Sequence, residues 1–117
     1  YIGVTPGGDA LANTGDGILL DDASYVLVGG YATDSSAANT IAANGINGIT
    51  IQGADSCGNL VLGNFIGTNA EGDAALGNDG AGVALIGGAH ENNIGVQSPL
   101  VVARNVISGN ASDGVLV

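Results

Sequence analysis

A glycine followed by alternating apolar residues recurs four times along this 117-residue chain. The glycines are Gly17, Gly48, Gly82 and Gly114, so the spacings are 31, 34 and 32 residues. Asp or Asn precedes three of them, which is typical of a turn. The alternation that follows each glycine predicts a short strand with one face turned inward. A period of about 32 residues indicates a repeat architecture in which each unit packs against its neighbours.

A longer repeat of about 65 residues lies over the shorter one. Its matching segments are 39–44 with 105–110, offset by 66 positions, and 1–3 and 8–10 with 65–67 and 72–74, offset by 64. We therefore expect a single domain, 1–117, with a first two-coil repeat unit at 1–64 and a second, incomplete two-coil unit at 65–117. The chain begins at Tyr1 without an initiator Met, as expected of a mature, processed or fragmentary chain.

The repeats predict an all-β fold. No segment shows convincing helical periodicity, and the expected strands are too short to form stable hairpins on their own. They can instead stack on the same strand of the next coil, about 4.8 Å away along an axis. The prediction is a parallel β-helix (β-solenoid) of about 3–4 coils of ~32 residues, roughly 15–20 Å tall, with uncapped ends.

Three stacks of inward-facing apolar residues are expected. The first consists of Ile18, Leu20, Ile49, Ile51, Val83, Leu85, Val115 and Val117; the second of Val28, Leu62 and Ile94, with Val26 and Leu60 beside them; the third of Ile41, Ile66 and Ile107. Asn44, Asn64 and Asn110 are expected at corners, because Asn tolerates a left-handed backbone and stacked amides can hydrogen-bond along the axis.

Two motifs carry a family resemblance. Residues 59–72 resemble the N-x-(V/I)-x-G-N-x-I-G-T-x-x-x-G pattern of secreted bacterial parallel β-helix repeat proteins, and residues 105–115 resemble their N-V-I-S-G-N…G-V block. The resemblance covers 39–117 well and 1–38 loosely. It implies the right-handed, pectate-lyase-like superfold and an extracellular or cell-surface location. It implies no activity, because the pattern is structural and surface proteins, adhesins and polysaccharide-active enzymes share it.

Composition excludes several function classes. Eleven acidic residues stand against one Lys or Arg, and the formal net charge is −10. Such a chain lacks the cations that nucleic acids and anionic membrane surfaces require, and no apolar run approaches the ~20 residues of a membrane span. The single Cys57 permits no intrachain disulfide; a half-buried apolar role is favoured over a thiol that links two chains.

Catalytic residues, cofactors and a defined metal site are not expected. Glycosidases need two carboxylates at a fixed separation, and nothing in the sequence fixes such a pair. Arg104 and His90 are the only Arg and His, and both are expected to be surface or charge-pairing residues. Asp16 and Asp79, in Asp-Gly turns, are weak calcium candidates, because no known calcium-loop pattern surrounds them.

The ends suggest a function. An uncapped solenoid exposes inward residues and unpaired backbone groups, so we expect end-to-end stacking through Ile2, Val115 and Val117, on copies of the chain or on flanking coils. This favours a non-enzymatic structural segment or subunit of an extracellular fibre or surface protein. The alternative is a carbohydrate-binding or polysaccharide-degrading module whose active residues lie mostly elsewhere. Tyr25 and Tyr31 would form a sugar platform only if they lay close together on one face.

Overall fold

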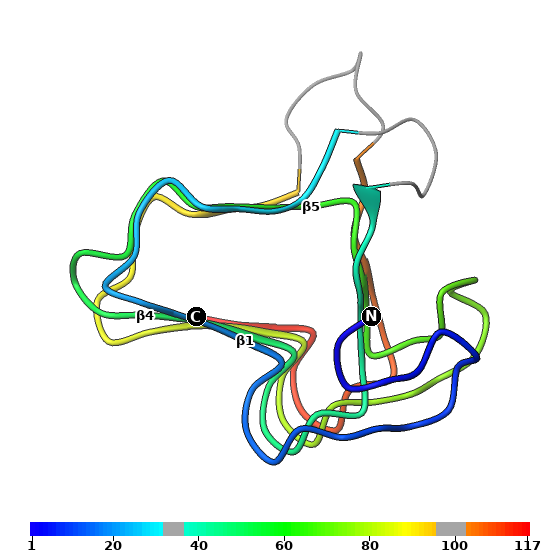
Figure 1. Cartoon of the computed structure of the whole chain (residues 1–117). Coiled ribbons are helices and arrows are strands. Elements are labelled where there is room, and N and C mark those ends of the chain that lie inside the picture. The colour runs from blue at the N-terminus through cyan, green and yellow to red at the C-terminus, as the bar shows by residue number, and fades with distance from the viewer. Residues whose placement is uncertain (32–36, 96–102) are drawn as a thin grey trace.

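The computed structural model describes residues 1–31, 37–95 and 103–117, and within these ranges the chain is all-β with almost no helix (Figure 1). Each strand is two to four residues long, as the closely spaced turn residues predict. The strands are β1 (Ile18–Asp21), β2 (Leu27–Gly29), β3 (Thr40–Ile41), β4 (Ile49–Gln52), β5 (Leu60–Leu62), β6 (Phe65–Ile66), β7 (Val83–Ile86), β8 (Asn93–Ile94), β9 (Val106–Ile107) and β10 (Val115–Leu116).

The strands form three parallel sheets. Their orders are β1-β4-β7-β10, β2-β5-β8 and β3-β6-β9, so each strand pairs with the equivalent strand one coil further along the chain. The successive passes of the chain nearly superpose in Figure 1. Four strands spaced by about 4.8 Å span about 14 Å between the outer two, and the smallest extent of the whole chain is 19 Å. This architecture is compatible with a β-solenoid, and the predicted height is confirmed.

Inward-facing aliphatic side chains fill the space between the sheets. In the first sheet, Ile18 pairs with Ile49, Ile49 with Val83 and Val83 with Val115, as predicted. The predicted third stack is also confirmed, because β6 pairs Ile66 with both Ile41 and Ile107. Ile2 extends it through a parallel bridge to Ile41.

The predicted second stack is wrong by one residue. Val28 pairs with Val61 and Val61 with Ile94, whereas Leu62 lies beside Gly29. Val61 belongs to the core cluster in the place predicted for Leu62. Leu60 likewise pairs with Leu27 rather than lying level with Val26. Residues 60–62 are three consecutive apolar residues, so an alternating pattern cannot distinguish inward from outward positions there.

Asn side chains form ladders along the axis, as predicted. One runs through four coils by amide-to-amide hydrogen bonds of 2.7–2.9 Å between Asn13, Asn44, Asn78 and Asn110. Two shorter ladders join Asn39, Asn64 and Asn105, and Asn59 and Asn92.

The predicted left-handed backbone at Asn44, Asn64 and Asn110 is wrong. The positive φ angles belong instead to the residues just before them, Ala43 (56°), Gly63 (70°) and Gly109 (74°). The residue before each Asn has the left-handed backbone, and the Asn itself has no positive φ and uses its amide to bind the neighbouring coils.

Candidate functional site

Two short excursions leave the coils on the same side of the molecule (Figure 1). We call residues 4–10 arm 1 and residues 68–75 arm 2. Each is closed by one antiparallel bridge, between Val4 and Ala10 in arm 1 and between Thr68 and Ala75 in arm 2. The two arms begin 64 positions apart, so they occupy equivalent positions in the longer sequence repeat. One coil without an arm lies between them.

The arms are held by different side chains at the same repeat position. In arm 1, the Thr5 hydroxyl accepts the Asp9 N–H at 3.1 Å. In arm 2, the Asn69 amide oxygen accepts the Asp73 N–H at 3.0 Å, and its nitrogen donates to the Asp73 carboxylate at 2.7 Å. Both arms are therefore preformed loops whose own side chains hold the turn.

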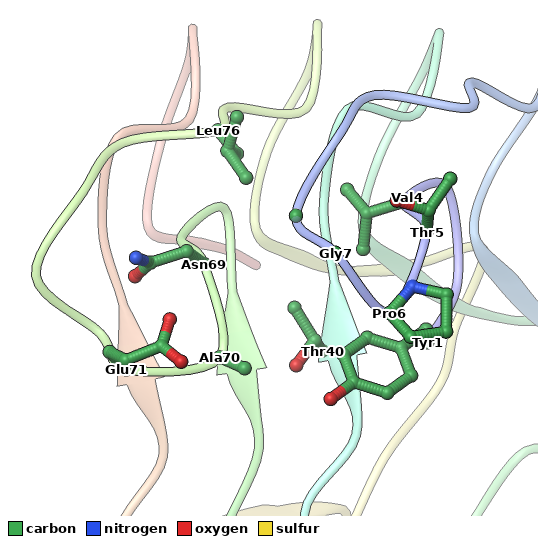
Figure 2. A pocket seen from close by; sticks show the side chains of 11 residues that line it. Tyr1, Val4, Thr5, Pro6, Gly7, Thr40, Asn69, Ala70, Glu71 and Leu76 are labelled. Atoms are coloured by element: carbon green, nitrogen blue, oxygen red, sulfur yellow. The ribbon is translucent and has the colours of Figure 1, made fainter.

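A cavity of about 60 Å³ lies between the arms. Tyr1 and Thr40 lie next to each other in it, with Glu71 of arm 2 across the gap (Figure 2). Its volume is well below the ~300 Å³ typical of small-molecule sites and is enough for a few waters or one small polar group. The cavity therefore does not form a substrate site on its own.

The two calcium candidates lie on different coils. Asp16 is half-buried, and its carboxylate accepts the Asn47 N–H at 2.9 Å. Asp79 is exposed, and its own N–H donates to the Asn44 carbonyl. Across residues 1–31, 37–95 and 103–117, no three His, Cys, Asp or Glu side chains gather where a metal ion would bind.

Ser24, Cys57 and His90 form a column at one corner, each 33 residues from the next. A parallel bridge joins Cys57 to His90, and the Cys57 Sγ lies 3.5 Å from the Ser24 Oγ. Cys57 is half-buried, whereas His90 is exposed and its Nδ1 lies 3.2 Å from the Gly88 carbonyl. The sequence analysis did not foresee the contact between His90 and Cys57, which the 33-residue spacing implies. Arg104 is exposed just before β9, away from this column in the sequence.

Tyr25 and Tyr31 flank opposite ends of β2 and are 84% and 51% exposed. Six residues of mostly extended chain, at ~3.3 Å each, separate their backbones by up to about 20 Å. Tyr25 has a left-handed backbone (φ 59°), and its ring lies over Gly58 of the next coil. The two tyrosines therefore stand on either side of β2 in the chain, and Tyr25 packs against the next coil.

The residues expected to stack at the ends lie at the first and last rungs. Ile2 is half-buried against the core, whereas Val115 and Val117 are 43% and 94% exposed. In the part of the chain that the structure describes, β1 and β10 are the two edge strands of the first sheet.

Comparisons with known proteins return no match: no family model fits the chain, and no curated protein or solved structure is significantly similar to it. A search of the described residues finds no helix long and apolar enough to cross a membrane.

Proposed function

We propose that this chain is a non-catalytic structural unit of an extracellular, right-handed β-solenoid that associates end to end. Right-handed crossovers account for about 98% of connections between parallel strands of one sheet, and the motifs at 59–72 and 105–115 point the same way. The partners are copies of the chain or flanking coils of the same kind.

The open edge of the first sheet supports this proposal most directly. Val83 and Val115 occupy equivalent inward positions on adjacent strands. Val83 is 0% exposed because a strand lies on each side of it, whereas Val115 is 43% exposed. An unpaired strand with apolar side chains is a template for further pairing, and a further coil would bury it.

The charge of the chain favours growth along the axis over lateral clumping. With a net charge of −10, like-charged solenoids repel one another side by side. Identical units that stack head to tail form an open filament rather than a closed ring when the rotation does not close.

Electron microscopy with sedimentation analysis of the purified 117-residue chain tests the proposal. We expect filaments with an axial repeat near 19 Å, the smallest extent of one chain. Monodisperse monomers at concentrations of about 100 μM would contradict end-to-end association.

The alternative is a carbohydrate-binding or polysaccharide-degrading module that uses calcium as its cofactor. The observation in its favour is the exposure of Tyr25, whose ring could stack on a sugar. An assay on pectin and alginate, with and without calcium, tests it. Cleavage that disappears in the Arg104→Ala variant would establish an enzyme and overturn the structural proposal.

A further inference from the structure

The cavity between arms 1 and 2 exists because the coil between them carries no arm. Arm 1 leaves the first coil and arm 2 the third, whereas in the second coil only two residues separate the inward Ile41 from the ladder residue Asn44. Two coil steps of about 4.8 Å set the arms about 10 Å apart, and the second coil forms the floor of the cavity. The cavity therefore lies on the side of the stacked coils, and the chain itself supplies the walls on both sides of it.

Thr40 lies on this floor and has a hydroxyl that the fold does not use. It precedes the inward Ile41 in β3, so its side chain points away from the core and faces the gap (Figure 2). Thr40 is 5% exposed, and none of the residues that the structure describes forms a hydrogen bond with its hydroxyl. Every fully buried polar side-chain atom of the described residues has a partner, so the Thr40 oxygen opens onto the cavity that it lines. A nearly buried hydroxyl without a partner is unfavourable, and a ligand in the cavity would supply one.

The charge around the cavity favours a cationic ligand. Glu71 of arm 2 directs its carboxylate into the gap across from Thr40 (Figure 2). Among the described residues that line the cavity, none is Lys, Arg or His. An anion would therefore meet a carboxylate there without a counter-charge, whereas a cation would be attracted both by Glu71 and by the net charge of −10.

The Tyr1 ring adds an aromatic face beside Thr40. Its equivalent 64 residues later, Phe65, packs under arm 2, because a Cβ on Gly72 would lie 3.0 Å from the Phe65 Cε1. In arm 1 nothing lies within 4 Å of a Cβ built on the equivalent Gly8. The Tyr1 ring is thus not taken up by its own arm, and it lines the cavity instead.

We propose that the cavity between the arms binds the ammonium group of an amino sugar, so that the solenoid carries a carbohydrate-binding site on its side. An ammonium group is about the size of a water molecule and fits a cavity of about 60 Å³, while the sugar ring stays outside it. The ammonium group meets the Glu71 carboxylate, a neighbouring sugar hydroxyl bonds the Thr40 Oγ1, and the apolar ring face lies against Tyr1.

Two features of the arms support this assignment. A lysine side chain would bring its ammonium group on a hydrocarbon stem and would leave no hydroxyl for Thr40. The arms are closed by their own hydrogen bonds, through Thr5 and Asn69, so little ordering is needed when a ligand binds. The site does not depend on end-to-end association, because the arms project sideways from the coils (Figure 1).

Equilibrium dialysis of the purified chain against glucosamine tests the proposal. A salt concentration of about 150 mM screens the attraction of distant carboxylates. We expect a dissociation constant of about 1 mM, as is usual for a ligand of this size. Glucose and N-acetylglucosamine should bind at least about tenfold more weakly, because neither carries a charge.

Three variants assign the contacts. Glu71→Gln should weaken glucosamine binding at least about tenfold. Asp9→Asn is its matched control, because Asp9 is an exposed acid of arm 1 that does not line the cavity, and its loss should change binding by less than about twofold. Thr40→Val should weaken binding at least about threefold and leave the urea midpoint unchanged, because the hydroxyl has no partner among the described residues.

The outcomes that would overturn the proposal are distinct. Equal weakening by Glu71→Gln and Asp9→Asn would show that amines are held only by the diffuse charge of the chain. Binding of glucose as tight as that of glucosamine would remove the role of the ammonium group. Equal affinity for Nα-acetyl-lysinamide would assign the cavity to lysine side chains rather than to amino sugars.

Discussion

Asn78 offers the sharpest test of how the coils are held together. It is fully buried, and its amide takes part in four hydrogen bonds. Its Oδ1 accepts the Asn44 backbone N–H at 3.0 Å and the Asn44 Nδ2 at 2.8 Å. Its Nδ2 donates to the Ile41 carbonyl at 3.3 Å and to the Asn110 Oδ1 at 2.7 Å. We therefore expect Asn78→Ala to be among the most damaging substitutions in the chain.

The magnitude follows from the groups that lose a partner. Asn44 is also buried, so both of its donors are left without an acceptor. Each unsatisfied buried polar group costs about 1–3 kcal/mol. Asn110 is half-buried, so its Oδ1 can accept a hydrogen bond from water instead. The Ile41 carbonyl loses only the 3.3 Å hydrogen bond from the Asn78 Nδ2. Asn78→Ala should therefore lower the free energy of unfolding by about 3–5 kcal/mol, a large part of the ~5–15 kcal/mol that stabilises a typical domain.

Urea unfolding followed by far-ultraviolet circular dichroism measures this loss, at concentrations where the chain is monomeric. Asn13→Ala is the control, because Asn13 is exposed and makes one ladder bond of 2.9 Å. It should cost less than about 1 kcal/mol. Equal losses in the two variants, or a loss below about 1 kcal/mol for Asn78→Ala, would refute the view that buried amide ladders hold the coils together.

Three further predictions concern strain, charge and calcium. Ala43→Gly should raise the urea midpoint by an amount equivalent to about 0.5–1 kcal/mol, because Ala43 has φ 56° and glycine adopts that conformation without steric cost. Lowering the pH from 7 toward the sequence pI of about 4.1 should strengthen assembly, measured by light scattering, because the net charge of −10 approaches zero. Asp16→Ala should cost about 1 kcal/mol in urea unfolding by removing the acceptor of the Asn47 N–H, whereas Asp16→Asn should cost less. If calcium stabilised the wild type and not Asp16→Asn, Asp16 would be a ligand rather than a turn acceptor.

The sequence predicted the fold wherever a glycine marked the start of a strand. Gly17, Gly48, Gly82 and Gly114 precede the strands of the first sheet, and alternation after each glycine aligned Ile18, Ile49, Val83 and Val115, and likewise Leu20, Ile51 and Leu85. Val117, the last residue predicted to face inward, lies beyond β10 and is exposed. The prediction failed at residues 60–62, where there is no alternation to read. There the register follows from a hydrogen bond that cannot be read from a pattern of apolar residues, from the Val26 N–H to the Asn59 Oδ1 at 2.9 Å.

The features around the candidate sites were predictable only in part. The 64-residue offset predicted that arms 1 and 2 are equivalent. It did not predict that both are loops outside the coils, because Thr5 closes one arm with a hydroxyl and Asn69 closes the other with an amide. The contact between Cys57 and His90 follows from their 33-residue spacing once the coil length is known. The position of Tyr25 before β2 and of Tyr31 after it depends on where that strand begins and ends, which the sequence indicates only roughly.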